Sequence, residues 1–321
     1  MNDMNYTALL KRIQQGLSVV ELVHTSHPRW PLPAHPHPFP PPNLHVSVLD
    51  SSFNPPTLAH LALANTLPPP TPAEEASTPT AQDFDARLLL LSVRNADKQL
   101  KPGDATYEQR VEMMILLARD LARSHARSVP AARDALPEAA PHEPNVAVAI
   151  IDEPTFVGKS AILRDFLSKR ILEILGPAQV ASAFPNNSPP TPKLTFLMGT
   201  DTIVRLFAPR YYADEQSMVA ALRRFLSPEG DDSRIICARR ISPSVVPAIA
   251  EEERIEVEMS EFARKIIPVH KLSFVDIGER ECTYSSSEVR ESLAKGDEGW
   301  KDMVTPSIME YITSKKLYTS V

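Results

Sequence analysis

Short apolar runs alternate with helical patterns along most of this 321-residue chain. The runs are rich in Leu, Ile and Val, a composition that favours strands buried on both faces of a sheet. They are Leu44–Leu49, Arg87–Val93, Asn145–Ile151, Leu194–Met198, Arg234–Ala238 and Leu272–Ile277. Helical patterns cover residues 56–66, 106–123, 159–175, 214–225, 287–295 and 306–315. The alternation predicts an α/β fold in which one parallel sheet carries helices on both faces.

Proline is unusually frequent, and its distribution divides the chain. Of the 32 prolines, 21 fall in four stretches, residues 28–42, 67–86, 128–144 and 178–193. Proline is disfavoured in helix interiors and central strands, so these stretches are predicted to be Pro-rich surface insertions and linkers. Residues 1–43 would form an N-terminal helix and Pro-rich extension, and 44–321 a main domain with insertions near 67–86, 128–144 and 178–193. A polyproline ligand for a protein partner is the alternative interpretation.

Charge and cysteine content exclude several classes of function. A net charge of −6 gives no overall attraction for nucleic acid, so any phosphate chemistry must depend on a local site. Cys237 and Cys282 are too few for a disulfide framework or a four-cysteine zinc site, which indicates a reducing compartment. The sequence shows neither the apolar core of a signal peptide nor an apolar run long enough for a membrane span. We expect a protein of the cytoplasm, or of cytoplasm and nucleus, without nucleic-acid or membrane partners; homo-oligomers stay open.

The first candidate motif follows the first predicted strand and reads DSSFNPPTLAH over residues 50–60. In open parallel sheets, ligands bind outside the carboxyl ends of the strands. Pro56 is typical of the first turn of a helix. His60 would then lie about one turn inside that helix, on the face of Thr57, where it can approach an anion at the helix start. The alternative is a partly buried histidine whose partners are all within the protein.

The second candidate motif lies near the C-terminus and reads YSSSEVR over residues 284–290. Serines that precede a helix cap its free N–H groups. Arg290 comes three residues after Ser287 and shares the face of the first turn. A helix cap followed by a surface arginine is the alternative interpretation.

The first motif resembles the (H/T)-x-x-H phosphate signature of the nucleotidyltransferase superfamily, in particular the G-S-F-N-P-x-T-x-x-H form of nicotinamide or nicotinate mononucleotide adenylyltransferases. The second is similar to that family's I-S-S-T-x-x-R motif. Gly199-Thr200-Asp201 resembles its G-x-D, and Lys98 a lysine that contacts substrate phosphate. Pro209 and Tyr212 are similar to a proline and a pyridine-stacking tryptophan of eukaryotic-type members. The resemblance covers roughly residues 44–318 outside the Pro-rich insertions, and includes Leu317-Tyr318 after the last helix.

The chain departs from the family pattern at two positions. Ser51 stands where the family has a glycine, which permits a close approach of the backbone to the nucleotide. Tyr212 stands where the family has tryptophan, which keeps an aromatic face with less area. Both departures are expected to affect the affinity for the nucleotides and the preference for a nucleotide base more than they affect the fold.

The resemblance implies a Rossmann-like nucleotidyltransferase fold and adenylyl transfer from ATP to nicotinamide mononucleotide, giving NAD and pyrophosphate. It implies catalytic roles for His60 and Arg290. The implied ATP-binding residues are Ser52, Phe53, Thr57, His60, Gly199, Ser285, Ser286, Ser287 and Arg290, and the implied mononucleotide-binding residues are Asn54, Lys98, Asp201 and Tyr212. Mg²⁺ is expected as cofactor, held mainly by the ATP phosphates, with no protein metal ligand. The alternatives are another ATP- or CTP-dependent nucleotidylyltransferase, or a non-catalytic nucleotide-binding protein, which the loss of the glycine at Ser51 would favour.

Overall fold

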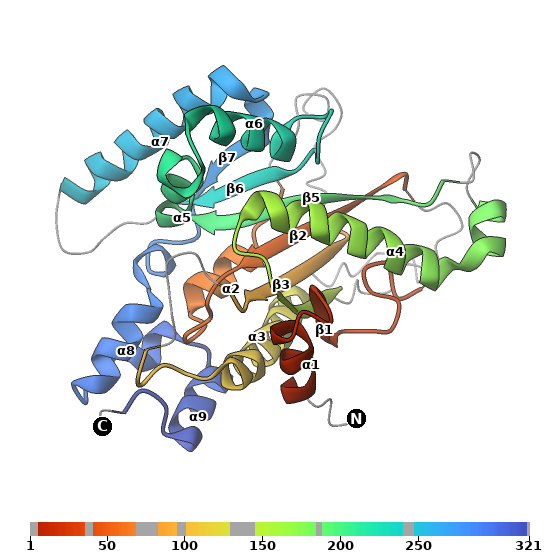
Figure 1. Ribbon diagram of the computed structural model, residues 1–321. Helices are drawn as coiled ribbons and strands as arrows, with labels where there is room; N and C mark the ends of the chain where they lie inside the picture. Colours follow the sequence, from red (N-terminus) through yellow and green to blue (C-terminus); the bar gives the residue numbers. More distant parts are fainter. Residues whose placement is uncertain are drawn as a thin grey trace, which may run out of the picture.

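A seven-stranded sheet forms the centre of the computed structural model, which describes residues 6–35, 41–68, 83–94, 101–128, 145–183, 188–239 and 247–319. Within these residues the strand order is β1-β4-β3-β2-β5-β6-β7 (Figure 1). The strands are β1 (Val20–Thr25), β2 (Asn43–Asp50), β3 (Ala86–Ser92), β4 (Val146–Ile151), β5 (Thr191–Gly199), β6 (Arg234–Ala238) and β7 (Leu272–Val275). Strand β1 is antiparallel to β4, and every other pairing is parallel. The predicted α/β fold and its six predicted strands are confirmed.

The direction of the strand connections reverses between β2 and β5. The chain proceeds from β2 through β3 to β4 on one side, and from β5 through β6 to β7 on the other. In doubly wound sheets the carboxyl ends of the strands at such a reversal form the ligand crevice. The exits of β2 and β5, which carry the first motif and the Gly199-Thr200-Asp201 segment, lie on the two sides of this reversal.

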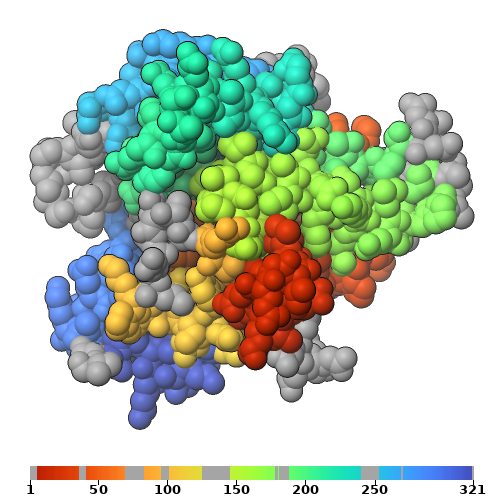
Figure 2. All heavy atoms as spheres, in the orientation of Figure 1, coloured from red at the N-terminus to blue at the C-terminus, as the bar shows by residue number. Residues whose placement is uncertain are grey.

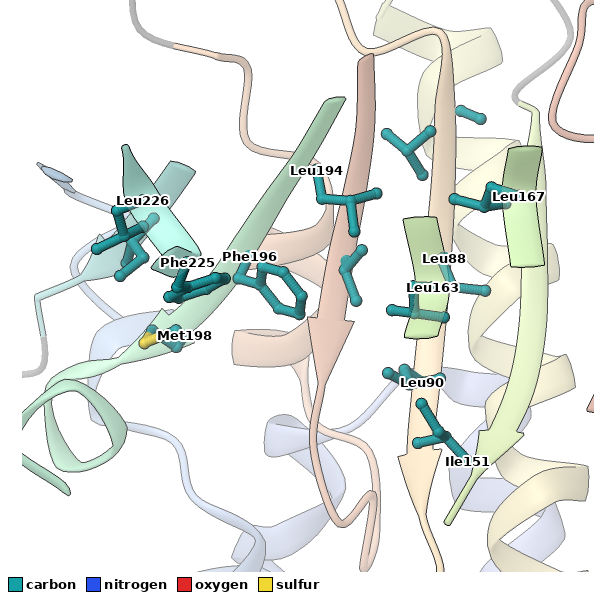
Figure 3. Packing of buried hydrophobic residues seen from close by; sticks show 14 of the residues in the cluster. Leu88, Leu90, Ile151, Leu163, Leu167, Leu194, Phe196, Met198, Phe225 and Leu226 are labelled. Carbon is teal, nitrogen blue, oxygen red and sulfur yellow. The ribbon is translucent and has the colours of Figure 1, made fainter. Parts of the chain in front are cut away.

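Helices cover both faces of the sheet, because neighbouring strand residues point to opposite sides. Leu88 and Leu90 belong to one core cluster, whereas Leu89 and Leu91 belong to the other. In Figure 3, Leu163 of α4 lies close to the first pair. The first face carries α4 (Phe156–Ala183), α5 (Thr200–Leu206), α6 (Glu215–Leu226) and α7 (Pro247–Ile266), and the second carries α1 (Tyr6–Gln14), α2 (Leu58–Ala64) and α3 (Tyr107–Ser128) (Figure 1).

The C-terminal segment packs against the outer side of α3. It contains α8 (Ser286–Ala294) and α9 (Pro306–Lys315), and its cluster includes Trp300, Ile308 and Met113 of α3. Figure 2 shows this segment, in blue, against the segment that carries α3, in yellow. This packing brings the end of the chain back to the exit of β2. None of the described helices combines the length and apolar composition that crossing a membrane requires.

Part of the predicted N-terminal extension contributes to the sheet and to its core. Residues 20–32 belong to the main domain, since β1 pairs with β4 and Trp30 is fully buried in the first core cluster. Asn145 donates to the carbonyls of Pro31 and Leu32, so this Pro-rich stretch is held in place rather than forming a surface linker. Its buried apolar side chains outweigh the preference of proline for exposed linkers.

The remaining Pro-rich stretches are only partly described. The predicted insertion at 178–193 is largely regular structure, because α4 reaches Ala183 and β5 begins at Thr191. Helix α4 has a kink at Gly176, whose φ of 66° is left-handed and which is followed by Pro177. Most of the insertions near 67–86 and 128–144 lies outside the described residues. Helices α5 and α7 lie outside the helical patterns found in the sequence.

Candidate functional site

The first motif forms the loop that leaves β2. Its helix, α2, begins at Leu58, with Thr57 as an extended N-cap residue, so the predicted helix start at Pro56 is wrong. The reason is local: the side chain of His60 reaches back and accepts a hydrogen bond from the Thr57 N–H, with 3.0 Å between nitrogen and Nδ1. This pairing is a form of capping box that ends the loop at Thr57.

Three further contacts hold the imidazole of His60. The Thr57 hydroxyl oxygen lies 2.9 Å from Nδ1, and the Ser51 hydroxyl oxygen lies 2.9 Å from Nε2. The ring of Phe53, with its centroid 5.3 Å away, packs against the imidazole. His60 therefore lies in the loop as predicted, and its two ring nitrogens face opposite parts of that loop.

Side chains of the second motif bond to the main chain of the first. Ser286 Oγ donates to the carbonyl of Pro55 at 2.7 Å. Arg290 Nη1 donates to the carbonyl of Asn54 at 2.5 Å. Two hydrogen bonds thus join the two predicted phosphate motifs, although more than 200 residues separate them in the sequence.

The start of α8 has the cap that its serines predict. Ser285 is the N-cap residue, and its hydroxyl oxygen accepts from the N–H of Glu288 at 3.1 Å. The Ser287 hydroxyl oxygen lies 3.3 Å from Arg290 Nη2, and the Ser286 carbonyl accepts from Nη1 of the same side chain at 3.1 Å. The guanidinium is therefore held over the first turn of α8, with its side chain 31% exposed.

Asn54 holds this loop to two other parts of the chain. Its Oδ1 accepts from the Ala105 N–H at 3.2 Å and from the Tyr318 hydroxyl at 2.9 Å. Its Nδ2 donates to Asp104 at 2.7 Å. Because these bonds use both ends of the amide, the structure gives Asn54 a scaffolding role, and its predicted contact with the mononucleotide stays a prediction.

Asp104 lies between two arginines and was not found from the sequence. Arg110 Nη2 is 3.5 Å from one carboxylate oxygen, and Arg290 Nε is 3.9 Å from the other. Partial burial works against the charged form, but hydrogen bonds from the Lys101 N–H and the Asn54 amide, together with both guanidiniums, lower the pKa of Asp104. The carboxylate therefore stays ionised and orients Arg290.

A buried ion pair lies next to the loop that leaves β2. The Lys159 ammonium contacts the carboxylate of Asp50, and the two side chains are only 4% and 8% exposed. Lys159 also lies over the ring of Phe156, 5.1 Å from its centroid. The negative charge that immediately precedes Ser51 is thus compensated within the protein.

The segment after β5 forms a second part of the candidate site. Gly199 is the N-cap residue of α5, and Asp201 lies exposed in its first turn. The main-chain carbonyl of Asp201 accepts from Arg205 Nε at 3.0 Å. Tyr212 packs half-buried against the first core cluster, and its hydroxyl donates to the Leu206 carbonyl at 2.9 Å. Burial raises the pKa of Tyr212 to about 12, so its phenol is neutral at physiological pH.

The structure treats three further predicted site residues, Lys98, Phe53 and Ser52, in different ways. Lys98 lies outside the described residues. The Phe53 side chain is fully buried, with φ of 44°, so it can meet a ligand only through its main chain. The Ser52 carbonyl accepts from Arg110 at 3.4 Å. The sequence reasoning missed Asp104 and Arg110, and it included Tyr318 only through the Leu317-Tyr318 match.

No family model and no curated protein matches this chain. Among solved structures it is similar to Plasmodium falciparum nicotinic acid mononucleotide adenylyltransferase complexed with NaAD, at 13% identity over 86% of this chain and 98% of that one, with a TM-score of 0.44. The same enzyme complexed with APC gives 14% identity, the same coverage and a TM-score of 0.41. Thermotoga maritima TmcAL bound with alpha-thio ATP gives 12% identity over 85% of this chain and 56% of that one, with a TM-score of 0.34. At these identities and TM-scores, the likeness assigns no activity to this chain.

Proposed function

We propose that this protein transfers the adenylyl group of ATP to nicotinamide mononucleotide, forming NAD and pyrophosphate. The junction of the two phosphate motifs is the observation that carries the proposal. Ser286 and Arg290 bond directly to the carbonyls of Pro55 and Asn54, so one anion can meet both motifs.

The reaction needs alignment and charge neutralisation rather than a base. An oxygen of the mononucleotide 5′-phosphate forms a bond to the α-phosphorus of ATP, and the bond from that phosphorus to the oxygen bridging to the β-phosphate breaks. Pyrophosphate leaves with the electron pair. Because the attacking phosphate is already ionised at neutral pH, the residues need only hold the reactants and stabilise the charge that develops.

The residues divide between the two substrates. His60 would act at the α-phosphate, and Ser285, Ser286, Ser287 and Arg290 at the β- and γ-phosphates. Ser52, Phe53, Thr57 and Gly199 would meet ATP through nearby main-chain and hydroxyl groups. Asp201 and Tyr212 would bind the pyridine mononucleotide at the exit of β5, and Lys98 would contact its phosphate.

Magnesium would enter as the ATP complex. Among the described residues, no three His, Cys, Asp or Glu side chains gather into a metal site. Asp104, the carboxylate beside Arg290, already faces two guanidiniums. We therefore propose that the ATP phosphates hold the Mg²⁺, and we assign no step to a metal bound by the chain.

The test is an assay of the full-length protein with ATP, nicotinamide mononucleotide and Mg²⁺, in which NAD and pyrophosphate are both measured. We expect equimolar products. A matched panel replaces the acceptor with nicotinate mononucleotide or 4′-phosphopantetheine, and ATP with CTP. Turnover only with a different acceptor or with CTP would assign another nucleotidylyltransferase, and ATP binding without any turnover would assign a non-catalytic nucleotide-binding protein.

A further inference from the structure

Ser51 differs from the glycine of the motif that it otherwise matches, and its side chain contacts His60. The Ser51 Oγ lies 2.9 Å from Nε2, the ring nitrogen on the side of the imidazole away from Thr57. Ser51 is partly exposed at the exit of β2. A glycine at this position would leave Nε2 without that partner.

The hydrogen bonds determine where the protons lie. A backbone N–H can only donate, so the Thr57 N–H makes Nδ1 of His60 an acceptor. A neutral imidazole carries one ring proton, which must then be on Nε2. Nε2–H donates to the Ser51 oxygen, and the Ser51 hydroxyl proton points to a different acceptor. The last donor in this chain of hydrogen bonds is therefore the Ser51 O–H.

The charge next to Ser51 is suited to an anion. Asp50 precedes Ser51, and its carboxylate is neutralised by buried Lys159. Arg290 supplies a positive charge to the same loop through the Asn54 carbonyl. A phosphate that approaches Ser51 therefore meets a hydroxyl donor without an uncompensated carboxylate behind it.

We propose that Ser51 locks His60 as its Nε2–H tautomer and presents the hydroxyl that donates to an ATP phosphate oxygen, with His60 as the positioning residue. The inference rests on the proposed function for the identity of the phosphate as ATP. In this arrangement His60 acts through Ser51: it polarises the serine hydroxyl and fixes its direction, while the serine makes the contact with the anion.

The first experiment measures the His60 tautomer in the full-length, unaltered protein. Nitrogen NMR of protein with ¹⁵N-labelled histidine distinguishes a protonated Nε2 from a protonated Nδ1. We expect protonated Nε2, with a proton that exchanges slowly with water, and faster exchange in Ser51→Ala. Protonated Nδ1 in the unaltered protein, or the same exchange rate in Ser51→Ala, would overturn the proposal.

The second experiment measures MgATP binding by calorimetry in Ser51→Ala and Ser51→Gly. Both variants lose the hydroxyl, and Ser51→Gly restores the glycine of the family motif. We expect about tenfold or greater weakening in both, the scale of a hydrogen bond to a charged group. Ser168→Ala is the matched control, since that hydroxyl donates to the Arg164 carbonyl within α4. Unchanged affinity in both Ser51 variants overturns the proposal.

These readouts separate the inference from the proposed function, because neither needs turnover. The expected tautomer and ATP effects without NAD formation would support Ser51 and count against the proposed reaction. NAD formation together with protonated Nδ1 would support the reaction and overturn the role of Ser51. Absence of MgATP binding by the unaltered protein would overturn both.

Discussion

The candidate site has two regions that are built differently. The phosphate region, defined as residues 50–60, 101–110, 284–290 and 318, joins four separate parts of the chain through hydrogen bonds to Asn54, Pro55 and their neighbours. In the β5 region, defined as residues 199–212, the Tyr212 hydroxyl bonds to Leu206 and Arg205 bonds to the Asp201 carbonyl, both within one segment.

The difference indicates how the two regions would contribute to catalysis. Phosphate transfer depends on donors held in fixed positions, and cross-linking of four segments supplies that rigidity. Recognition of the second substrate depends on surface complementarity, which one short segment can provide. We therefore expect changes in the phosphate region to alter stability and rate, and changes in the β5 region to alter the affinity for the mononucleotide.

The largest expected effect is on the free energy of unfolding, and it tests whether the buried Lys159–Asp50 ion pair stabilises the phosphate region. Lys159→Met leaves Asp50 as a buried charge without its partner, and should lower the free energy of unfolding by about 3–5 kcal/mol. Lys169→Met is the control on the same helix, because its pair with Asp165 is 70% and 64% exposed and should contribute at most about 1 kcal/mol. Urea unfolding measures both. Equal losses would show that the Asp50 pair does not anchor the loop.

The next largest effects are on kcat and KM, and they distinguish the phosphate region from the β5 region. His60→Ala should lower kcat by roughly 10²- to 10³-fold, the scale of one donor to the transition state, because the Ser51 hydroxyl would lose the partner that fixes its direction. Tyr212→Ala should instead raise KM for nicotinamide mononucleotide about tenfold, while Tyr212→Phe, which keeps the ring, should stay near wild type. Steady-state rates with each substrate varied provide the measurement. A loss of ATP affinity in Tyr212→Ala would reverse the assignment of the regions.

Much of the fold could be predicted because its signals are local. The six predicted strands are continuous apolar runs, and α9 begins where Pro306 follows the Thr305 cap. Strand β1 was missed because Glu21 and His24 interrupt its apolar character and because it is an antiparallel edge strand. Trp30 was assigned to a linker because its many neighbouring prolines hid its contribution to the core.

The site residues, like the strands, could be predicted only where the signal is local in the sequence. Thr57, His60, Ser285 and Arg290 stand in short strings that can be read from the sequence. Asp104, Lys159 and Tyr318 each act through a partner far along the chain, with Asp104 50 positions from Asn54, Lys159 109 from Asp50 and Tyr318 264 from Asn54. No local pattern predicts such pairings, because only the folded sheet brings the partners together.

A smaller effect tests how the end of the chain supports the phosphate region. Tyr318→Phe removes the hydroxyl that bonds to Asn54, and should lower the free energy of unfolding by about 0.5–1.5 kcal/mol and raise KM for ATP. Tyr311→Phe is the control, since its hydroxyl contacts Glu112 away from the loop. A similar loss of stability with unchanged KM is expected there. A shared effect on KM would show that Tyr318 acts only through general stability.

The smallest expected effect is on how the free energy of unfolding falls at acidic pH. Because the folded protein lowers the pKa of Asp104 below its ordinary value of 3.8, the ionised carboxylate contributes stability above that value. The contribution is lost as the pH falls from 3.8 through the lower pKa of the folded state. Asp104→Asn should therefore flatten the decline in stability over that window, measured by urea unfolding at successive pH values. An identical acid slope in the variant would contradict the arrangement of Asp104 between two guanidiniums.

A crystal structure of the full-length protein with Mg²⁺ and a non-hydrolysable ATP analogue tests the central claim most directly. The claim is that the two motifs form one phosphate site. We predict that the triphosphate lies between the loop of residues 51–60 and the start of α8, in contact with Ser286, Ser287 and Arg290. A triphosphate bound elsewhere, with neither motif touching it, would contradict the account.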